Sequence, residues 1–227
     1  MRAFLLAAGR GTRLGALTQS TPKCLVEIRG TPLLDIWIQR LTAAGFTEVR
    51  LNTHHLASIV SEHVAKADYP IDVQPHHEPE LLGTAGTLAH HRSWLAETDT
   101  LVAHADNFAL FDIADFIRSH KARSPETLLS MLAFRTPTPE TCGILQVDEK
   151  NILRNMWEKS REQHGNLANA AIYILTPAVL PCLHGAFDFS TDVIPKLFGK
   201  IHVVETDRTH IDIGTPESLE RAQNTEQ

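Results

Sequence analysis

The chain has 227 residues, of which 43% are hydrophobic and 21% are charged, so it can bury one sizeable globular core. Its formal net charge of −6 argues against a nucleic-acid-binding protein, because affinity for a nucleic-acid backbone depends on clustered lysine and arginine residues. The three cysteines are far apart and match no zinc-binding spacing, so we expect neither a disulfide framework nor a zinc site. The first apolar run, residues 3–8, is too short for a signal-peptide core or a membrane span, and we expect a cytoplasmic protein without membrane contact.

The first half of the chain alternates short apolar segments with helical patterns, which predicts βαβ units and a largely parallel sheet. Residues 32–44 carry apolar side chains at helical spacing, and Gly45 is placed to end that helix. The other expected elements here are strands at 3–7, 48–52, 71–74 and 100–104, a helix at 57–65 and a helix opening at 83–86.

Beyond a helix expected at 112–121, strands follow one another with few helices between them, which predicts antiparallel additions to the sheet. We expect no linker or repeat, and therefore a single domain over residues 1–227. The expected elements here are strands at 128–134, 144–147, 152–157, 168–175 and 201–205, a helix after Ser190 and a final helix from Thr215.

The segment LLAAGRGTRLGALTQSTPKCL, residues 5–25, directly follows the first strand. Gly9 and Gly11 allow a tight turn that brings backbone N–H groups close to an anion, and Arg13 and Lys23 add positive charge. A dinucleotide-binding loop would need glycine at Leu14, and a Walker loop would need Gly-Lys at residues 14–15. A polyphosphate held by a different kind of loop is therefore expected.

G-x-G-T-R-L followed after about ten residues by P-K resembles the sugar-1-phosphate nucleotidyltransferases, and the resemblance continues over most of the chain. It implies an α/β fold, a Rossmann-like three-layer α/β/α sandwich with a mixed central sheet. Within the single domain, residues 1–110 would bind the nucleotide and residues 111–227 the sugar phosphate. The resemblance implies catalytic roles for Arg13, Lys23 and Asp106, and nucleotide binding by Leu6, Ala7, Ala8, Gly9, Gly11, Thr12 and Arg13.

Residues 81–88, LLGTAGTL, resemble the LGTAG element of the family, which implies that Gly83 and Thr84 also bind the nucleotide. Small residues at this place would let a base or ribose approach before a helix begins. The same residues fit an ordinary turn into a helix equally well, so both interpretations stay open.

Asp106 ends a hydrophobic strand, and ligands of open α/β sheets gather at the carboxyl ends of strands. The resemblance implies that Asp106 and Asp212, the latter in DIGTPE, hold Mg²⁺ as cofactor, although Ala105 stands where the family has glycine. Two carboxylates suit a hard cation that keeps several waters. Asp212 could instead cap a helix, but Thr215 and Pro216 already fit the cap and first helical position.

The sugar phosphate is expected to contact a second set of residues. Trp157-Glu158-Lys159 resembles the family's E-K-P with Ser160 in place of proline, and NLANAAIYIL resembles its N-x-G-I-Y-I strand with Ala171 near the usual glycine. Solvated side chains or a turn would account for these residues on their own. The resemblance implies that the sugar phosphate is bound by Gly143, Glu158, Lys159 and Asn169.

The substrates that the resemblance implies are an NTP and a sugar 1-phosphate, joined to an NDP-sugar with release of pyrophosphate. Ala7-Ala8 resembles uridylyl- and cytidylyltransferases, including N-acetylmuramate-1-phosphate uridylyltransferase. FDFSTDVIP, residues 187–195, and the late DIGTPESL resemble mannose- and manno-heptose-1-phosphate guanylyltransferases of surface-polysaccharide pathways, and we favour GTP with a manno-configured sugar. The alternatives are a UTP-dependent uridylyltransferase, a CTP-dependent phosphocholine-type cytidylyltransferase and a catalytically idle nucleotide-sensing protein. The sequence leaves open whether the chain forms a homodimer.

Thirteen histidines include the doublets at residues 54–55, 76–77 and 90–91. Adjacent side chains point in different directions, so a doublet rarely supplies two ligands to one ion. We interpret the doublets as surface or loop residues.

Overall fold

The computed structural model describes residues 1–225, which form two compact units. The first unit contains residues 1–81, 102–113 and 209–225, and the second contains residues 82–101 and 114–208. The chain leaves the first unit twice and returns to it at its carboxyl end. No helix within residues 1–225 is long and apolar enough to cross a membrane.

The first unit is built on parallel strands. Strand β1 pairs with β4 and β4 with β5, all in parallel, and the order of the strands is β6-β1-β4-β5. The elements of this unit are β1 (Arg2–Leu6), η1 (Thr12–Leu14), α1 (Leu17–Ser20), η2 (Lys23–Leu25), β2 (Glu27–Ile28), β3 (Thr31–Pro32), α2 (Leu33–Ala43), β4 (Glu48–Thr53), α3 (Ala57–Lys66), β5 (Asp72–His77), β6 (Thr100–His104), β7 (Asn107–Ala109), β13 (His210–Asp212) and α7 (Pro216–Gln223).

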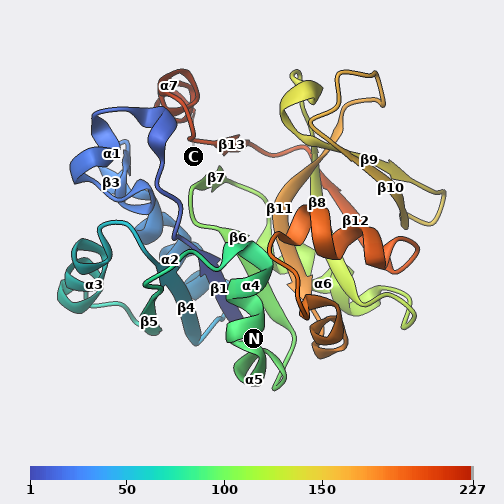
Figure 1. Cartoon of the computed structure of the whole chain (residues 1–227), viewed down its shortest axis with the longest axis horizontal. Coiled ribbons are helices and arrows are strands. Elements are labelled where there is room, and N and C mark those ends of the chain that lie inside the picture. Colours follow the sequence, from blue (N-terminus) through green and yellow to red (C-terminus); the bar gives the residue numbers. More distant parts are fainter. Residues whose placement is uncertain (226–227) are drawn as a thin grey trace. The chain divides into compact units, whose positions relative to one another are not determined.

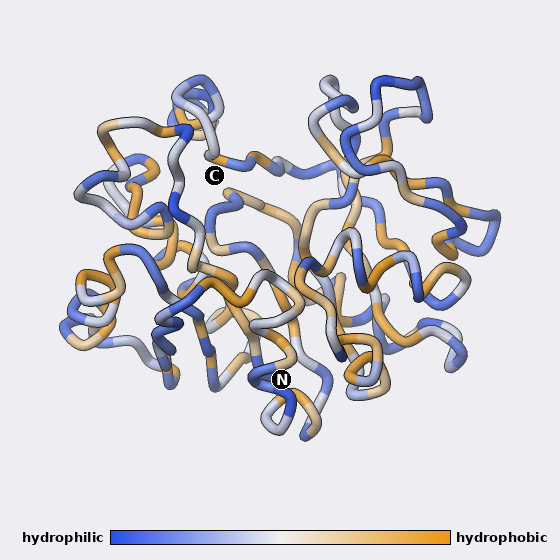
Figure 2. Tube along the Cα trace, in the orientation of Figure 1, coloured by the Kyte–Doolittle hydropathy of each residue, from blue (hydrophilic) through white to orange (hydrophobic). Residues whose placement is uncertain are grey.

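Apolar side chains explain why these segments form strands and a helix. Ala3, Phe4 and Leu5 of β1 are fully buried, and α2 buries its apolar face, including Trp37 and Leu41. Each fully buried Leu or Phe side chain contributes about 1.5–3 kcal/mol. The chain is mostly hydrophobic along the central strands and hydrophilic in many outer loops (Figure 2).

The carboxyl end of the chain completes the first unit. Helix α7, red in Figure 1, lies beside the blue amino-terminal segment, and Gln223 donates a hydrogen bond to the carbonyl of Glu27 at 2.7 Å. Thr215 caps α7 through reciprocal hydrogen bonds with Ser218. The predicted start of this helix is confirmed. The cap at Thr215 explains why the chain changes there from an extended conformation to a helix.

The second unit is mainly antiparallel. Strand β11 pairs antiparallel with β8 and β9, β10 pairs antiparallel with β9, and β12 adds one parallel pairing to β8. The elements of this unit are α4 (Gly83–His90), α5 (Arg92–Leu95), α6 (Ile113–Ala122), β8 (Leu129–Arg135), η3 (Pro139–Thr141), β9 (Gly143–Val147), β10 (Leu153–Glu158), β11 (Leu167–Leu175), η4 (Pro177–Leu183), η5 (Phe189–Val193), η6 (Ile194–Leu197) and β12 (Ile201–Thr206).

Two sequence interpretations need correction here. The helix expected after Ser190 is not a regular α-helix, because η5 has π-helical and η6 has 3-10 hydrogen bonding. Pro195 within this stretch has no N–H to donate, which disfavours a continuous α-helical ladder. The interpretation of the histidine doublets as surface or loop residues is wrong for His91, which is buried. The doublet at 76–77 lies in strand β5, with His77 exposed at the surface.

Gly83 lets the segment around Phe187 dock on the start of α4. Gly83 has a φ of +76°, and a Cβ added to it would lie 2.3 Å from the carbonyl oxygen of Phe187. That carbonyl accepts a hydrogen bond from the N–H of Ala85 at 3.0 Å, and the N–H of Phe187 donates to Asp192 at 2.8 Å. Thr84 supports the same segment, because its hydroxyl accepts from the N–H of Phe189 at 2.7 Å.

A buried histidine connects helix α6 to its surroundings in the second unit. His120 is fully buried, with Nδ1 2.9 Å from the Ser130 hydroxyl and Nε2 3.2 Å from the Asp99 carboxylate. A carboxylate only accepts, so Nε2 carries the proton and Nδ1 accepts from Ser130. Burial and nearby Arg123 lower the pKa of His120 below its usual 6.5, outweighing Asp99. The neutral imidazole is therefore the form that the fold accommodates.

We predict that stability falls when the pH drops below about 6.5. Below that pH the unfolded chain binds a proton that His120 does not bind in the folded state. The contribution of neutral His120 to stability is therefore complete above the pKa of the unfolded state and is lost as the pH falls toward the lower pKa of the folded state. One such proton changes the free energy of unfolding by at most about 1.4 kcal/mol per pH unit. Denaturant unfolding of wild type and His120→Gln between pH 5 and pH 8 measures this, and an identical pH dependence in the two proteins would contradict it.

Gly83→Ala is predicted to cost about 2–4 kcal/mol of stability, because it adds left-handed backbone strain and a clash with a fixed carbonyl. Gly185→Ala is the matched control. Gly185 also lies in the second unit with a φ of +69°, but its added Cβ would meet no atom within 4 Å. The control should lose only the strain, about 1–2 kcal/mol. Equal losses in denaturant unfolding would show that the contact with Phe187 is unimportant.

Candidate active site

The glycine-rich loop of the first unit follows β1 without a break. Gly11 has a φ of +64°, and its carbonyl accepts hydrogen bonds from the Leu14 N–H and the Thr18 hydroxyl, both at 2.9 Å. An added Cβ on Gly11 would lie 2.9 Å from the Thr18 methyl group. Gly9 is exposed and a Cβ on it would meet nothing within 4 Å. The loop is thus fixed at Gly11 and open at Gly9.

Asn52 fixes the beginning of the same loop. It is the penultimate residue of β4. Its side-chain oxygen accepts a hydrogen bond from the N–H of Ala7 at 2.8 Å, and its amide donates to Glu78 at 3.1 Å. The carbonyl of Leu6 accepts from the N–H of Ala105 at 3.0 Å, so the ends of β1 and β6 are joined as well.

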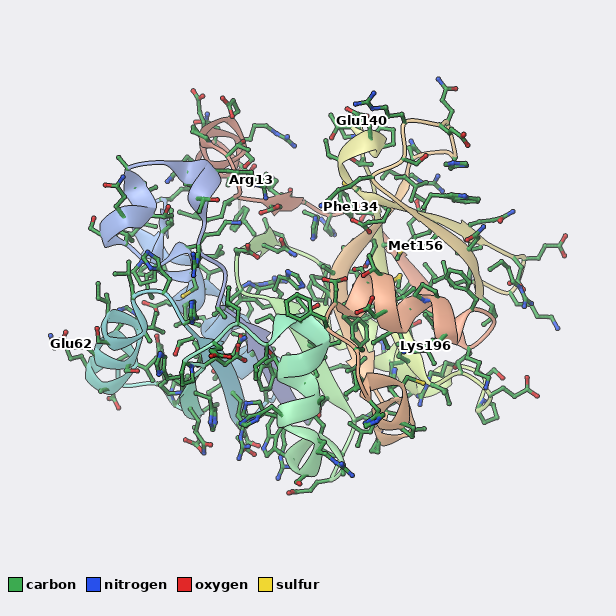
Figure 3. The ribbon with its side chains drawn as sticks, viewed as in Figure 1. Arg13, Glu62, Phe134, Glu140, Met156 and Lys196 are labelled. Atoms are coloured by element: carbon green, nitrogen blue, oxygen red, sulfur yellow. The ribbon has the colours of Figure 1, made fainter. Side chains whose placement is uncertain are left out.

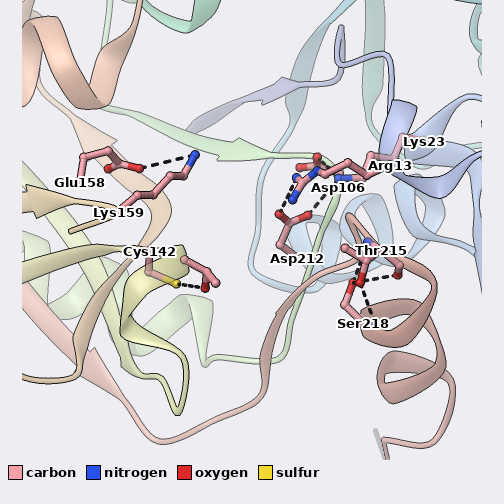
Figure 4. Close-up of polar contacts among 10 residues, drawn as sticks. Arg13, Lys23, Asp106, Cys142, Glu158, Lys159, Asp212, Thr215 and Ser218 are labelled. Carbon is pink, nitrogen blue, oxygen red and sulfur yellow. Dashed lines mark hydrogen bonds and ion pairs between the residues drawn. The ribbon is translucent and has the colours of Figure 1, made fainter. Parts of the chain in front are cut away.

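Lys23 joins the two acidic residues. Its ammonium lies 2.5 Å from Oδ2 of Asp106 and 2.9 Å from Oδ1 of Asp212 (Figure 4). The Lys23 side chain is only 7% exposed, whereas Asp106 and Asp212 are 27% and 49% exposed. Two residues separated by 106 positions therefore converge on one cation, as a shared metal site requires.

A short antiparallel pair of strands brings the carboxylates together. Strand β13 pairs with β7, with Asp212 opposite Asn107, and the N–H of Ile213 donates to the carbonyl of Asp106 at 3.2 Å. Trp37 of α2 holds β7 in place by donating to the carbonyl of Asn107 at 2.9 Å. Arg40 of α2 donates to the carbonyls of Ala109 and Phe111.

Arg13 supplies a second positive charge to this group. Its side chain extends toward β13 (Figure 3), and its guanidinium lies 3.6 Å from the Asp212 carboxylate. A Cβ on Gly214 would lie 2.8 Å from the same guanidinium, so glycine leaves room for Arg13 there. The Arg13 side chain is 68% exposed, which leaves it available to an incoming anion.

The charges in this group hold each other in the ionised form. Burial disfavours the charged form of Lys23, but Asp106 and Asp212 outweigh it and raise the pKa of Lys23 above 10.5. Burial alone would raise the pKa of Asp106, yet Lys23 and His104 hold it below 3.8. At neutral pH Lys23 is therefore an ammonium and Asp106 a carboxylate.

These residues fit a divalent cation that also binds a ligand. One oxygen of Asp106 and one of Asp212 already contact the same cation, the Lys23 ammonium. Carboxylates are the ligands that Mg²⁺ prefers. Within residues 1–225 no three His, Cys, Asp or Glu side chains gather as a metal site. Mg²⁺ commonly uses one or two carboxylates and completes its shell with waters and substrate phosphates, so two ligands suffice.

The second unit contains the residues expected to bind the sugar phosphate. Glu158 ends β10 opposite Gly143, and a Cβ on Gly143 would lie 2.7 Å from the Glu158 carboxylate, so glycine is needed for this close approach. Burial raises the pKa of Glu158, with Asp188 adding to the effect against Lys159. Lys159 has a φ of +49° and its ammonium lies 3.9 Å from Glu158.

Asn169 has an internal role in β11. Its amide donates to the Tyr173 hydroxyl at 2.8 Å, and its side-chain oxygen accepts from the N–H of Ala171 at 2.9 Å. The pairing of β11 with β8 shifts register between Asn169 and Tyr173, and Ala171 has a φ of +53°. The β-bulge explains why the family pattern has glycine nearby. Sugar binding by Asn169 stays a prediction.

The outcome for the expected site residues is mixed. Arg13, Lys23, Asp106 and Asp212 meet within the first unit, next to the loop that carries Leu6, Ala7, Ala8, Gly9, Gly11 and Thr12. Gly83 and Thr84 lie in the second unit, where contacts with the segment around Phe187 already account for both, and nucleotide binding by them stays a prediction.

Sequence reasoning missed Thr18 and Asn52. A polar residue near the end of an apolar strand could have indicated Asn52, but nothing indicated Thr18.

Comparisons with known proteins identify the family of the chain. A family model described as Nucleotidyl transferase matches residues 2–227. Mannose-1-phosphate guanyltransferase of Schizosaccharomyces pombe is 29% identical over 223 residues, covering 95% of this chain and 61% of the relative. The catalytic subunit beta of mannose-1-phosphate guanylyltransferase of Drosophila pseudoobscura is 31% identical over 225 residues, covering 96% and 60%. The chain thus spans about three fifths of the length of these curated relatives.

Solved structures show the same fold. HddC from Yersinia pseudotuberculosis superimposes with a TM-score of 0.83 at 26% identity, covering 98% of this chain and 97% of that one. Its complex with GMP-PN gives a TM-score of 0.82 at 28% identity with the same coverage. The predicted α/β fold with a mixed sheet and flanking helices is confirmed, and by the match over residues 2–227 the chain belongs to the nucleotidyl transferase family.

Proposed function

We propose that the chain transfers a nucleoside monophosphate from an NTP to a sugar 1-phosphate, giving an NDP-sugar and pyrophosphate. The observation that carries the proposal is the group of Arg13, Lys23, Asp106 and Asp212 beside an open glycine-rich loop. Such a group can hold a triphosphate and a divalent cation together, which is what phosphoryl transfer needs.

In this reaction an oxygen of the sugar phosphate attacks the α-phosphorus, a new P–O bond forms, and the bond to the β-phosphate breaks. The attacking oxygen is already anionic at neutral pH, so no general base is required. Bound Mg²⁺ would polarise the phosphates and neutralise developing charge. Asp106 and Asp212 would hold the ion, Lys23 would neutralise charge near the reacting phosphorus, and Arg13 would stabilise the departing pyrophosphate.

The second unit would supply the groups that recognise the sugar phosphate. Lys159 is exposed and carries the charge for the phosphate, and Glu158 can accept hydrogen bonds from hydroxyl groups. Gly143, through its backbone, and Asn169 would contribute further contacts. We propose that Gly83 and Thr84 also bind the nucleotide.

For the base and the sugar we propose GTP and a manno-configured sugar. Relatives named mannose-1-phosphate guanyltransferase and the GMP-PN complex of HddC support this choice. Ala7-Ala8 favours a pyrimidine nucleotide instead, so UTP and CTP belong in the test. We further propose a role in cytoplasmic synthesis of activated sugars for surface polysaccharides.

Pyrophosphate release from ATP, CTP, GTP and UTP, each with a panel of sugar 1-phosphates and phosphocholine, tests the proposal. We expect turnover with GTP and mannose or manno-heptose 1-phosphate, dependent on Mg²⁺ and abolished by a chelator. Turnover with UTP or with phosphocholine would correct the substrate and retain the reaction class. Absence of pyrophosphate release from every pair would contradict the proposed activity.

Arg13→Ala is predicted to lower kcat/KM by about a hundredfold, because one charged group is lost where negative charge develops. Stability should change by less than about 0.5 kcal/mol, because the side chain is largely exposed. Arg118→Ala is the matched control, since Arg118 is also 68% exposed and also pairs with an aspartate, Asp115. Wild-type turnover by folded Arg13→Ala protein would remove Arg13 from the mechanism.

A further inference from the structure

We propose that Lys23 occupies the place of the divalent cation in the nucleotide-free protein, so that the cation binds only together with the NTP, whose phosphates take over the Lys23 ammonium. This inference rests on the proposed function for the identity of the metal ligands. It concerns the order in which the site fills, which the reaction class alone does not determine.

The contacts of Lys23 compete directly with a metal ion. Its ammonium lies 2.5 Å from Oδ2 of Asp106 and 2.9 Å from Oδ1 of Asp212, and the Arg13 guanidinium lies 3.6 Å from Oδ2 of Asp212. Three of the four carboxylate oxygens therefore already face a positive group of the chain. Mg²⁺ needs its oxygen ligands at about 2.1 Å and gives up its own waters reluctantly. An ion bound by both carboxylates would lie within a few ångströms of the ammonium, and two positive groups at that distance repel each other.

The charge balance points the same way. Asp106 and Asp212 contribute two negative charges, and Lys23 and Arg13 contribute two positive charges, so the group is neutral without a metal. A divalent ion added alone would leave two excess positive charges beside a buried lysine, which is unfavourable. A triphosphate brings several negative charges and new acceptors for both cations.

The position of the Lys23 backbone makes the exchange feasible. An added Cβ on Gly11 would lie 3.4 Å from the Cβ of Lys23, so the side chain starts beside the glycine-rich loop and ends at the carboxylates. Its four-carbon stem can redirect the ammonium by rotation about its own bonds. Phosphates bound at the loop could therefore receive the ammonium while Lys23 keeps its backbone position in η2.

Binding of Mn²⁺ to the nucleotide-free protein, followed by electron paramagnetic resonance of the free ion, tests the inference. Lys23→Met keeps the length of the side chain and removes its charge, and it should bind Mn²⁺ at least about tenfold more tightly than wild type. Lys23→Gln is the second variant in case Lys23→Met does not fold. Adding a non-hydrolysable GTP analogue to wild type should lower the signal of free Mn²⁺ below the level that the same analogue produces without protein.

Two controls show whether a gain in Mn²⁺ affinity comes from the site of Asp106 and Asp212 or from the loss of any positive charge. Lys66→Met also removes one positive charge from the first unit, at an exposed site paired with Glu62, and should leave Mn²⁺ affinity unchanged. Adding Asp106→Asn to Lys23→Met should abolish the gain. If the folded Lys23 variants bind Mn²⁺ no more tightly than wild type, the inference fails.

The outcome is separable from that of the proposed function. Wild-type pyrophosphate release together with unchanged Mn²⁺ affinity in the Lys23 variants would reject only the competition between Lys23 and the ion. A gain in affinity that depends on Asp106, in a protein that releases no pyrophosphate from any substrate pair, would support the competition and reject the proposed reaction.

Discussion

The Lys23 ammonium between Asp106 and Asp212 is the interaction on which the rest of the first unit depends. Two carboxylates within reach of each other repel unless a cation lies between them, and Lys23 provides that cation from within the chain. The same pairing keeps Lys23 charged although it is buried. The four charged side chains sum to zero net charge, which suits the proposed exchange of Lys23 for a divalent cation when an anionic substrate binds.

The surrounding structure fixes this group in place. Trp37 and Arg40 of α2 hold the segment after Asp106, and the pairing of β7 with β13 brings Asp212 opposite it. Asn52 and Thr18 fix the two sides of the glycine-rich loop. Main-chain carbonyls and N–H groups carry most of these contacts, so the carboxylates are positioned before any ligand arrives, which is a condition for electrostatic catalysis.

The regular elements could be predicted from the sequence better than the contacts that bring Arg13, Lys23, Asp106 and Asp212 together. The helix over Leu33–Ala43, strand β6 and the cap at Thr215 follow from apolar spacing, glycine and capping residues, which are local signals. Strands β7 and β13 have three residues each and pair across about a hundred positions, so no local pattern announces them. The role of Gly83 depends on Phe187, a contact over more than a hundred positions, and the sequence alone could not distinguish it from a nucleotide contact.

Crystals of the wild-type protein with Mn²⁺ and a non-hydrolysable GTP analogue, measured at the manganese absorption edge, test the central claim most directly. The account predicts an anomalous peak coordinated by Asp106 and Asp212, with the Lys23 ammonium moved to a phosphate oxygen, and no such peak when Mn²⁺ is supplied without nucleotide. An ammonium that stays on both carboxylates, with manganese bound elsewhere on the phosphates, would contradict it.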